Sequence, residues 1–164
     1  GLGKIGTKAF TMSAKLSSIT IPSTVAEIGA DCFFNSAMLT TVEFSSPSSL
    51  EHLGEGAFSE CIRLTDINLP DSLEKIENWT FENCSSLELI SLPENLNFIG
   101  VAAFENCLSL EELYLSSQIS VIRRKAFNNC PELSLYINHD KSPSGWAVDW
   151  DFGLSKTPVW GSNN

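Results

Sequence analysis

The phrase Phe-Glu-Asn-Cys occurs at residues 81–84 and again 23 residues later, at 104–107. The interval between the two is one copy of a repeat. Phenylalanines follow this repeat along the chain with successive spacings of 23, 25, 23, 23 and 23 residues: Phe10, Phe33, Phe58, Phe81, Phe104 and Phe127. A fixed period of this length is typical of a solenoid, in which each copy buries its apolar side against the next and none is stable alone.

Each copy carries further apolar residues at fixed distances from its phenylalanine. Six positions later there is a leucine in all six copies: Leu16, Leu39, Leu64, Leu87, Leu110 and Leu133. The Leu-x-x-Ile-x-Leu segment that starts there alternates in its last three positions, which predicts a short strand. Proline at positions 22, 70 and 93 ends the strand, because it cannot donate a ladder hydrogen bond.

The rest of each copy predicts two more pieces of local structure. Leu-x-x-Ile-Gly predicts a second, shorter extended segment. Gly-x-x-Ala-Phe-x-x-Cys predicts a single helical or 3₁₀ turn, too short to be stable by itself. Together the columns predict an α/β repeat solenoid, dominated by β-structure, with one short helical or 3₁₀ turn in each 23-residue coil.

The chain divides into a repeat region and a tail. Residues 1–137 hold about five and a half copies, the first of which is truncated, because Leu2, Ile5 and Gly6 match only the second half of the motif. This start predicts that the chain is the C-terminal piece of a longer protein. Residues 138–164 lose the period and are rich in Trp, Pro, Gly and Asp, a composition that predicts an aromatic cap over the last coil.

Charge and hydropathy exclude two classes of partner. The net charge is −10 and the basic residues are scattered, so neither nucleic acid nor an anionic membrane surface is expected to bind. No apolar run approaches the roughly 18 residues of a membrane span, so direct membrane insertion is not expected. The first residues also lack the pattern of a signal peptide.

Four of the five cysteines fall on one column, three residues after the phenylalanine: Cys61, Cys84, Cys107 and Cys130. Neighbours in such a column lie within reach of a disulfide, but a column along one wall provides no tetrahedral set of zinc ligands. Ser13 and Ser36 occupy the same column in the first two copies, which favours buried free thiols over disulfides or a metal. Cys32 lies on the alanine column and is interpreted as a small core residue. No cofactor is expected.

No set of residues indicates catalysis. His52 and His139 lie in unrelated places and neither has a repeated nucleophilic or acidic partner. Asp140, Asp149 and Asp151 do not have the spacing of an EF-hand loop, so we interpret them as surface acids. The chain is therefore predicted not to be an enzyme.

The outward positions of the predicted strands form two columns that the repeat leaves variable. From these we select eight candidate partner-binding residues: Thr41, Glu43, Asp66, Asn68, Leu89, Ser91, Glu112 and Tyr114. The surface is acidic, and Leu89 and Tyr114 project near its C-terminal end. Tyrosine is favoured at binding hot spots, so a protein-binding patch is one interpretation; a solvated sheet face is the other.

The full motif, Leu-x-x-Ile-x-Leu-Pro-x-x-Leu-x-x-Ile-Gly-x-x-Ala-Phe-x-x-Cys, resembles the BspA-like, Treponema-type leucine-rich repeat family over roughly residues 2–137. The tail, with Pro-Ser-Gly-Trp and Val-Trp-Gly, also resembles the ending of many cell-surface members. The resemblance implies a right-handed leucine-rich-repeat superhelix with one strand per coil in a continuous sheet. It further implies an extracellular bacterial protein, often an adhesin or a binder of host proteins, without catalytic residues.

These observations favour a non-enzymatic protein-recognition or adhesion module of a secreted or cell-surface protein, with a host or cell-surface protein as its partner. Two alternatives stay open. One is a structural spacer within a larger surface protein, and the other is a ligand-binding, carbohydrate-binding or hydrolytic site in the C-terminal cap at 138–164.

Overall fold

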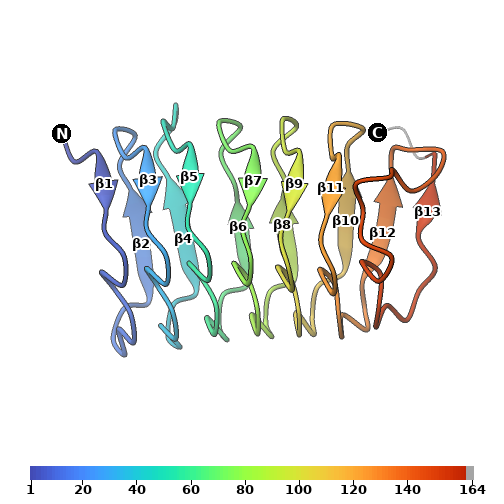
Figure 1. Ribbon diagram of the computed structural model, residues 1–164. Coiled ribbons are helices and arrows are strands. Elements are labelled where there is room, and N and C mark those ends of the chain that lie inside the picture. The colour runs from blue at the N-terminus through green and yellow to red at the C-terminus, as the bar shows by residue number, and fades with distance from the viewer. Residues whose placement is uncertain (162–164) are drawn as a thin grey trace.

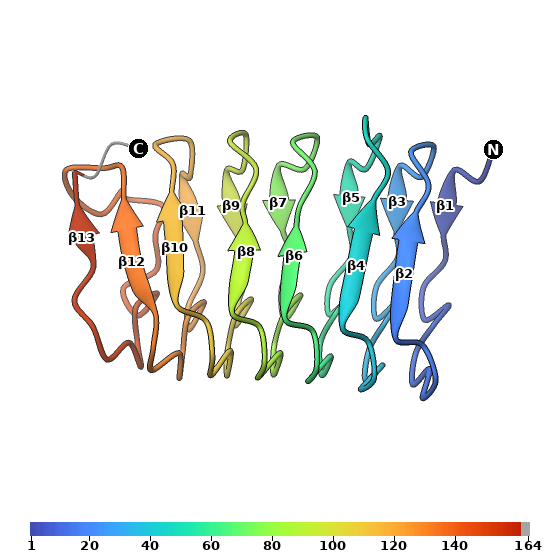
Figure 2. The ribbon, with the colours of Figure 1, turned by 180° about the vertical axis from the view of Figure 1, so that it is seen from behind.

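The computed structural model describes residues 1–161 as a row of about seven stacked coils, running from one terminus to the other (Figure 1). Six coils each contribute a longer front strand, and these lie side by side in Figure 2: β2 (Ser18–Ile21), β4 (Thr41–Phe44), β6 (Asp66–Asn68), β8 (Leu89–Ser91), β10 (Glu112–Leu115) and β12 (Ser134–Ile137). Two-residue back strands lie within the second apolar segment of each coil: β1 (Lys4–Ile5), β3 (Glu27–Ile28), β5 (His52–Leu53), β7 (Lys75–Ile76), β9 (Phe98–Ile99) and β11 (Val121–Ile122). A last strand, β13 (Val159–Trp160), pairs with β12.

All strand pairs are parallel, and the coils form two sheets on each side rather than one. The front strands divide into β2-β4-β6-β8 and β10-β12-β13, and the back strands into β1-β3-β5 and β7-β9-β11. The expectation of one strand per coil in a continuous sheet is therefore wrong. The second extended segment is a strand of its own, and the ladder is interrupted between β8 and β10 in front and between β5 and β7 behind.

The predicted helical or 3₁₀ turn is also wrong, because the described residues contain no helix, and the fold is an all-β solenoid. In the coil around Phe81, the N–H groups of Trp79, Phe81 and Asn83 donate to carbonyls of the next coil at 2.8–2.9 Å. Only the intervening N–H groups bond within the coil, as that of Cys84 does to Phe81. Trp79 and Asn83 have φ of 57° and 59°, the left-handed region, which turns alternate N–H groups outward and prevents a helix.

The core is a set of columns that run along the solenoid axis. The phenylalanine rings stack in an unbroken series with centroids 5.1–5.6 Å apart: Phe10, Phe33, Phe58, Phe81, Phe104 and Phe127. Five of them are fully buried, and Phe10, in the first coil, is half-buried. Each ring removes its two faces from water only because a neighbour lies on both sides, so burial is shared between coils.

The five cysteines are free thiols and all are buried. In the column, each thiol donates a hydrogen bond to the main-chain carbonyl of the preceding coil's phenylalanine; Cys84 reaches Phe58 O at 3.2 Å. Ser36 makes the same bond, from its hydroxyl to Phe10 O, at 2.7 Å. The column therefore requires a small side chain with a donor, which explains why serine replaces cysteine. Burial raises the pKa of the Cys61 and Cys130 thiols to about 12.

The repeated glycine is required by close packing and not by a positive φ. A Cβ on Gly100 would lie 2.5 Å from the main-chain nitrogen of Asn78 in the preceding coil, and Gly54 is equally close to Ala30. Glu77 replaces this glycine in the coil of β7, which is where the back sheet is interrupted. Arg123 also replaces it, yet keeps the ladder bond from its N–H to Ile99 O at 2.9 Å.

The tail continues the coil geometry instead of only covering its end. The N–H of Trp146 bonds to Pro143 O, as that of Leu96 does to Pro93 O, and the N–H of Ala147 bonds to Ile122 O as a glycine of the motif would. Trp150 then lies edge-on against Phe127, with ring centroids 6.2 Å apart. In residues 1–161 we find no helix with the length and hydropathy needed to cross a membrane.

Candidate functional site

The outward side chains of β2, β4, β6, β8, β10 and β12 form the surface that we call the front face. Strand pairing places Thr41 beside Asp66 and Asp66 beside Leu89, so the predicted columns exist within the first front sheet. Glu43 lies at its N-terminal part, where it accepts a hydrogen bond from the Thr20 hydroxyl at 3.3 Å. All eight predicted residues lie on front strands, and all but the half-buried Thr41 are exposed.

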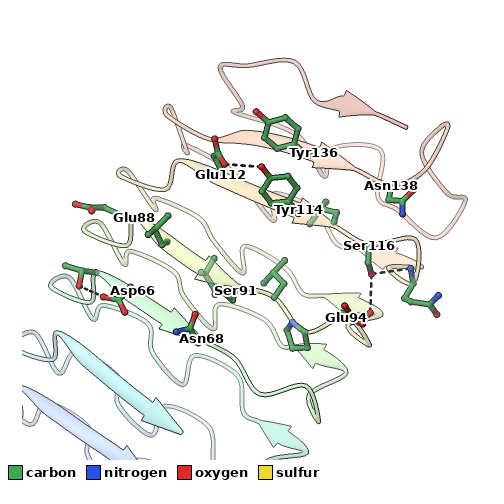
Figure 3. Close-up of a pocket in the computed structure, with 17 residues that line it drawn as sticks. Asp66, Asn68, Glu88, Ser91, Glu94, Glu112, Tyr114, Ser116, Tyr136 and Asn138 are labelled. Atoms are coloured by element: carbon green, nitrogen blue, oxygen red, sulfur yellow. Dashed lines mark hydrogen bonds between the residues drawn. The ribbon is translucent and has the colours of Figure 1, made fainter. Parts of the chain in front are cut away.

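A hollow of about 890 Å³, which we call the front hollow, opens over the interruption between β8 and β10 (Figure 3). Six of the eight predicted residues line it: Asp66, Asn68, Leu89, Ser91, Glu112 and Tyr114. Thr41 and Glu43 do not. The structure therefore brings most of the predicted residues together and leaves the two from β4 outside.

Two tyrosine rings form one wall of the front hollow. Tyr114 of β10 and Tyr136 of β12 stack with centroids 4.8 Å apart and planes 12° from parallel. The Tyr114 hydroxyl donates to Glu112 Oε2 at 3.2 Å, as Figure 3 shows. Desolvation of the phenol, its hydrogen bond to Glu112 and the charge of that carboxylate together raise the pKa of Tyr114. Tyr114 is nevertheless 45% exposed, so part of the residue is accessible to a partner.

Leu89 is the apolar residue of the front hollow. Its side chain is 57% exposed at a position that carries Thr41, Asp66 and Glu112 in other coils. Its outward direction follows from the strand alternation, because Ile90 takes the inward position in β8. An exposed leucine and an exposed tyrosine that line the same hollow give it the apolar and aromatic composition expected at the centre of a protein interface.

The sequence interpretation missed Tyr136 and two of the four acidic residues that line the front hollow, Glu88 and Glu94. Tyr136 aligns with Tyr114 in the strand register, although 22 residues separate them. Shifting the last copy by the one residue it lacks would have placed Tyr136 on the predicted column. Glu88 and Glu94 also line the front hollow. They flank β8, outside its alternating positions, so the alternation does not predict which way their side chains point.

A second, smaller hollow of about 560 Å³ adjoins the first and shares Glu88 and Glu112 with it. It adds the carboxylates of Glu111 and Glu132. Lys156 from the tail lies at its edge, where its ammonium group hydrogen-bonds the main-chain carbonyl of Glu132. The acidic character of the front face is thus concentrated at β8, β10 and β12.

Two of the residues considered for catalysis or metal binding, His139 and Asp149, make contacts that belong to the fold. His139 Nε2 and Trp146 Nε1 both lie 3.2 Å from Ile119 O, and the two rings pack edge to face. The main-chain carbonyl of Asp149 accepts the N–H of Lys125, which continues the coil ladder. Over residues 1–161, no three His, Cys, Asp or Glu side chains are grouped so as to hold a metal ion.

Comparison with known proteins gives a match to a family and to several solved structures. Residues 3–134 match six copies of the BspA type leucine-rich repeat region. The leucine-rich repeat protein of T. pallidum is similar with a TM-score of 0.76 and 27% identity, over 96% of this chain and 65% of that one. No curated protein matches the chain in sequence.

Two further solved structures share the fold at lower identity. A leucine-rich cell surface protein of Faecalibacterium prausnitzii gives a TM-score of 0.65 at 24% identity, over 90% of this chain and 45% of its own. A leucine-rich repeat protein of Eubacterium ventriosum gives 0.65 at 22%, over 86% and 44%. The chain thus spans less than two thirds of the length of each of these three proteins.

Proposed function

Because the chain belongs to the family of BspA type leucine-rich repeat proteins, we propose that it is a non-enzymatic protein-recognition or adhesion module of a secreted or cell-surface bacterial protein. Leucine-rich repeat domains generally mediate protein interactions, and one structural relative is described as a cell surface protein. The partner in this proposal is a host or cell-surface protein.

The observation that carries the proposal is the exposure of Leu89 and Tyr114 inside the front hollow. A leucine and a tyrosine with half their surface in water are available for burial by a partner. Burying the exposed half of each would contribute about half of the roughly 1.5–3 kcal/mol that full burial of an exposed apolar side chain provides. The surrounding carboxylates form the polar rim that interfaces of this type have.

The proposal is tested by surface plasmon resonance of the purified chain against a panel of extracellular-matrix and serum proteins. For any protein that binds, the double variant Leu89→Ser, Tyr114→Ala is expected to lose at least about tenfold in affinity, since central apolar anchors dominate binding energy. Trp79→Ala removes an aromatic residue with 42% exposure from a turn outside the front face and is the matched control.

Two outcomes would contradict the proposal. Equal loss of affinity in Trp79→Ala and in the double variant would show that the front face is not the binding surface. Absence of binding to the whole panel, with correctly folded protein, would favour the structural spacer instead.

A further inference from the structure

The front hollow is acidic on the sides that a partner would approach. Asp66, Glu88, Glu94 and Glu112 line it, and within residues 1–161 no Lys, Arg or His does. The adjoining hollow continues this charge with Glu111 and Glu132, and its single cation, Lys156, is already hydrogen-bonded to protein oxygens. Charge complementarity therefore selects a cationic partner segment over an acidic one.

The tyrosine wall adds a second requirement that charge alone does not impose. Tyr114 is 45% exposed, and its hydroxyl contacts the Glu112 carboxylate at 3.2 Å. Because Tyr136 covers one face of the ring, a partner would have to use the opposite face. Stacking on Tyr136 holds the ring in place, so it is positioned before a partner arrives. A planar cation can stack on such a ring and pair with the adjacent carboxylate at once, whereas a compact ammonium group gains less from the ring.

Leu89 completes the set of contacts. It lies on the strand next to β10 across the interrupted ladder, and its exposed side chain offers an apolar surface within the same hollow. A long basic side chain covers apolar surface with its methylene stem while its charged end pairs elsewhere. The methylenes of one arginine can cover Leu89 while its guanidinium reaches the tyrosine wall.

We propose that the front hollow binds an arginine side chain on a basic segment of the partner protein, with the guanidinium stacked on Tyr114 and paired with Glu112. Neighbouring basic residues of that segment meet Asp66 and Glu88. The inference rests on the proposed function, because it names the partner chemistry for the same surface.

The test measures binding of short fluorescent peptides by anisotropy at low and moderate salt. Three peptides share a Gly-Ser background and differ in two central residues, which are both arginine, both lysine, or both citrulline, the uncharged analogue of arginine. Wild-type protein is expected to bind the arginine peptide with at least about 3-fold higher affinity than the lysine peptide. It is expected to bind the citrulline peptide with at least about 10-fold lower affinity than the arginine peptide. Higher salt is expected to weaken binding of the arginine peptide to the protein.

Variants separate the roles of the two named residues. Tyr114→Leu is expected to abolish the preference for arginine over lysine, whereas Tyr114→Phe keeps the ring and the preference. Glu112→Gln is expected to lower arginine binding about 5-fold or more. Glu51→Gln changes the net charge equally at an exposed position outside both front-face hollows and is expected to have little effect.

Three results would overturn the inference: citrulline binding as tight as arginine, an arginine preference that survives Tyr114→Leu, or equal losses in Glu51→Gln and Glu112→Gln. If a panel protein binds through the front face while the arginine peptide does not bind, the inference fails and the proposed function stands. If the arginine peptide binds as expected but front-face variants leave every panel protein unaffected, the proposed function fails instead.

Discussion

From Ser36 onward, each side chain of the cysteine column is small and donates a hydrogen bond to a main-chain carbonyl of the preceding coil. We therefore expect Cys84→Ser to be less destabilising than Cys84→Ala. Serine keeps the donor to Phe58 O, as Ser36 does to Phe10 O, and we expect a cost within about 1 kcal/mol. Alanine loses the donor and leaves a small cavity, for about 1–2 kcal/mol. Urea unfolding measures both, and a larger loss for serine than for alanine would contradict this role of the column.

The sequence predicted most core residues correctly because each one recurs in several copies. The columns of phenylalanine, leucine and isoleucine are buried as expected, and the serine in the cysteine column indicated free thiols. The left-handed residues beside each phenylalanine were not predicted. In four coils an asparagine lies two positions after the phenylalanine, as Asn83 does, and asparagine tolerates a positive φ. The spacing of the apolar residues in this segment fits a helical turn equally well, so the sequence pattern alone does not distinguish the two conformations.

At the scale of the strands, the motif glycine allows the main chains of neighbouring coils to approach closely on the back of the solenoid. Gly100→Ala is expected to destabilise the chain by about 2–3 kcal/mol, because its Cβ would overlap the main chain of Asn78. Gly6 has the same place in the first coil but nothing within 4 Å of its Cβ position. Gly6→Ala is therefore expected to be neutral or stabilising by up to about 1 kcal/mol.

Thermal unfolding of the two glycine variants measures this difference. Similar melting temperatures for Gly6→Ala and Gly100→Ala would mean that contact with the preceding coil does not determine the need for glycine.

Strand positions were predictable from alternation, but the sheet interruptions were not. The interruption at Glu77 depends on how one coil packs against its neighbour. The sequence of a single copy of the motif does not contain this information.

For the solenoid as a whole, the last coils depend on the tryptophans of the tail. Trp150 covers the end of the phenylalanine stack at Phe127 and is itself buried. Trp150→Ala is expected to cost about 3–5 kcal/mol, concentrated in the C-terminal coils because each coil contacts only its neighbours. Hydrogen exchange by mass spectrometry should show faster exchange in residues 121–137 and little change in residues 50–80. Uniform acceleration along the chain would instead indicate a fully cooperative solenoid.

The tail was predicted as an aromatic cap, and one of its tryptophans, Trp150, lies against the last phenylalanine of the stack. Its continuation of the coil geometry was not predicted, because tryptophan takes the positions that leucine and alanine occupy in the motif. Pro143 and Trp146 keep the spacing of Pro93 and Leu96, and that spacing was the available signal.

The hydrogen bonds from Phe81 and its flanking residues to the next coil run along the solenoid axis, and this orientation determines how the molecule responds to mechanical load. A pull on the two ends is borne by a series of such ladders, so the outermost coil can peel away while the others stay intact. Each 23-residue coil would release roughly 80 Å of chain, at about 3.5 Å per residue. A molecule attached at both ends could thus lengthen in steps under shear, limiting the tension on whatever it holds.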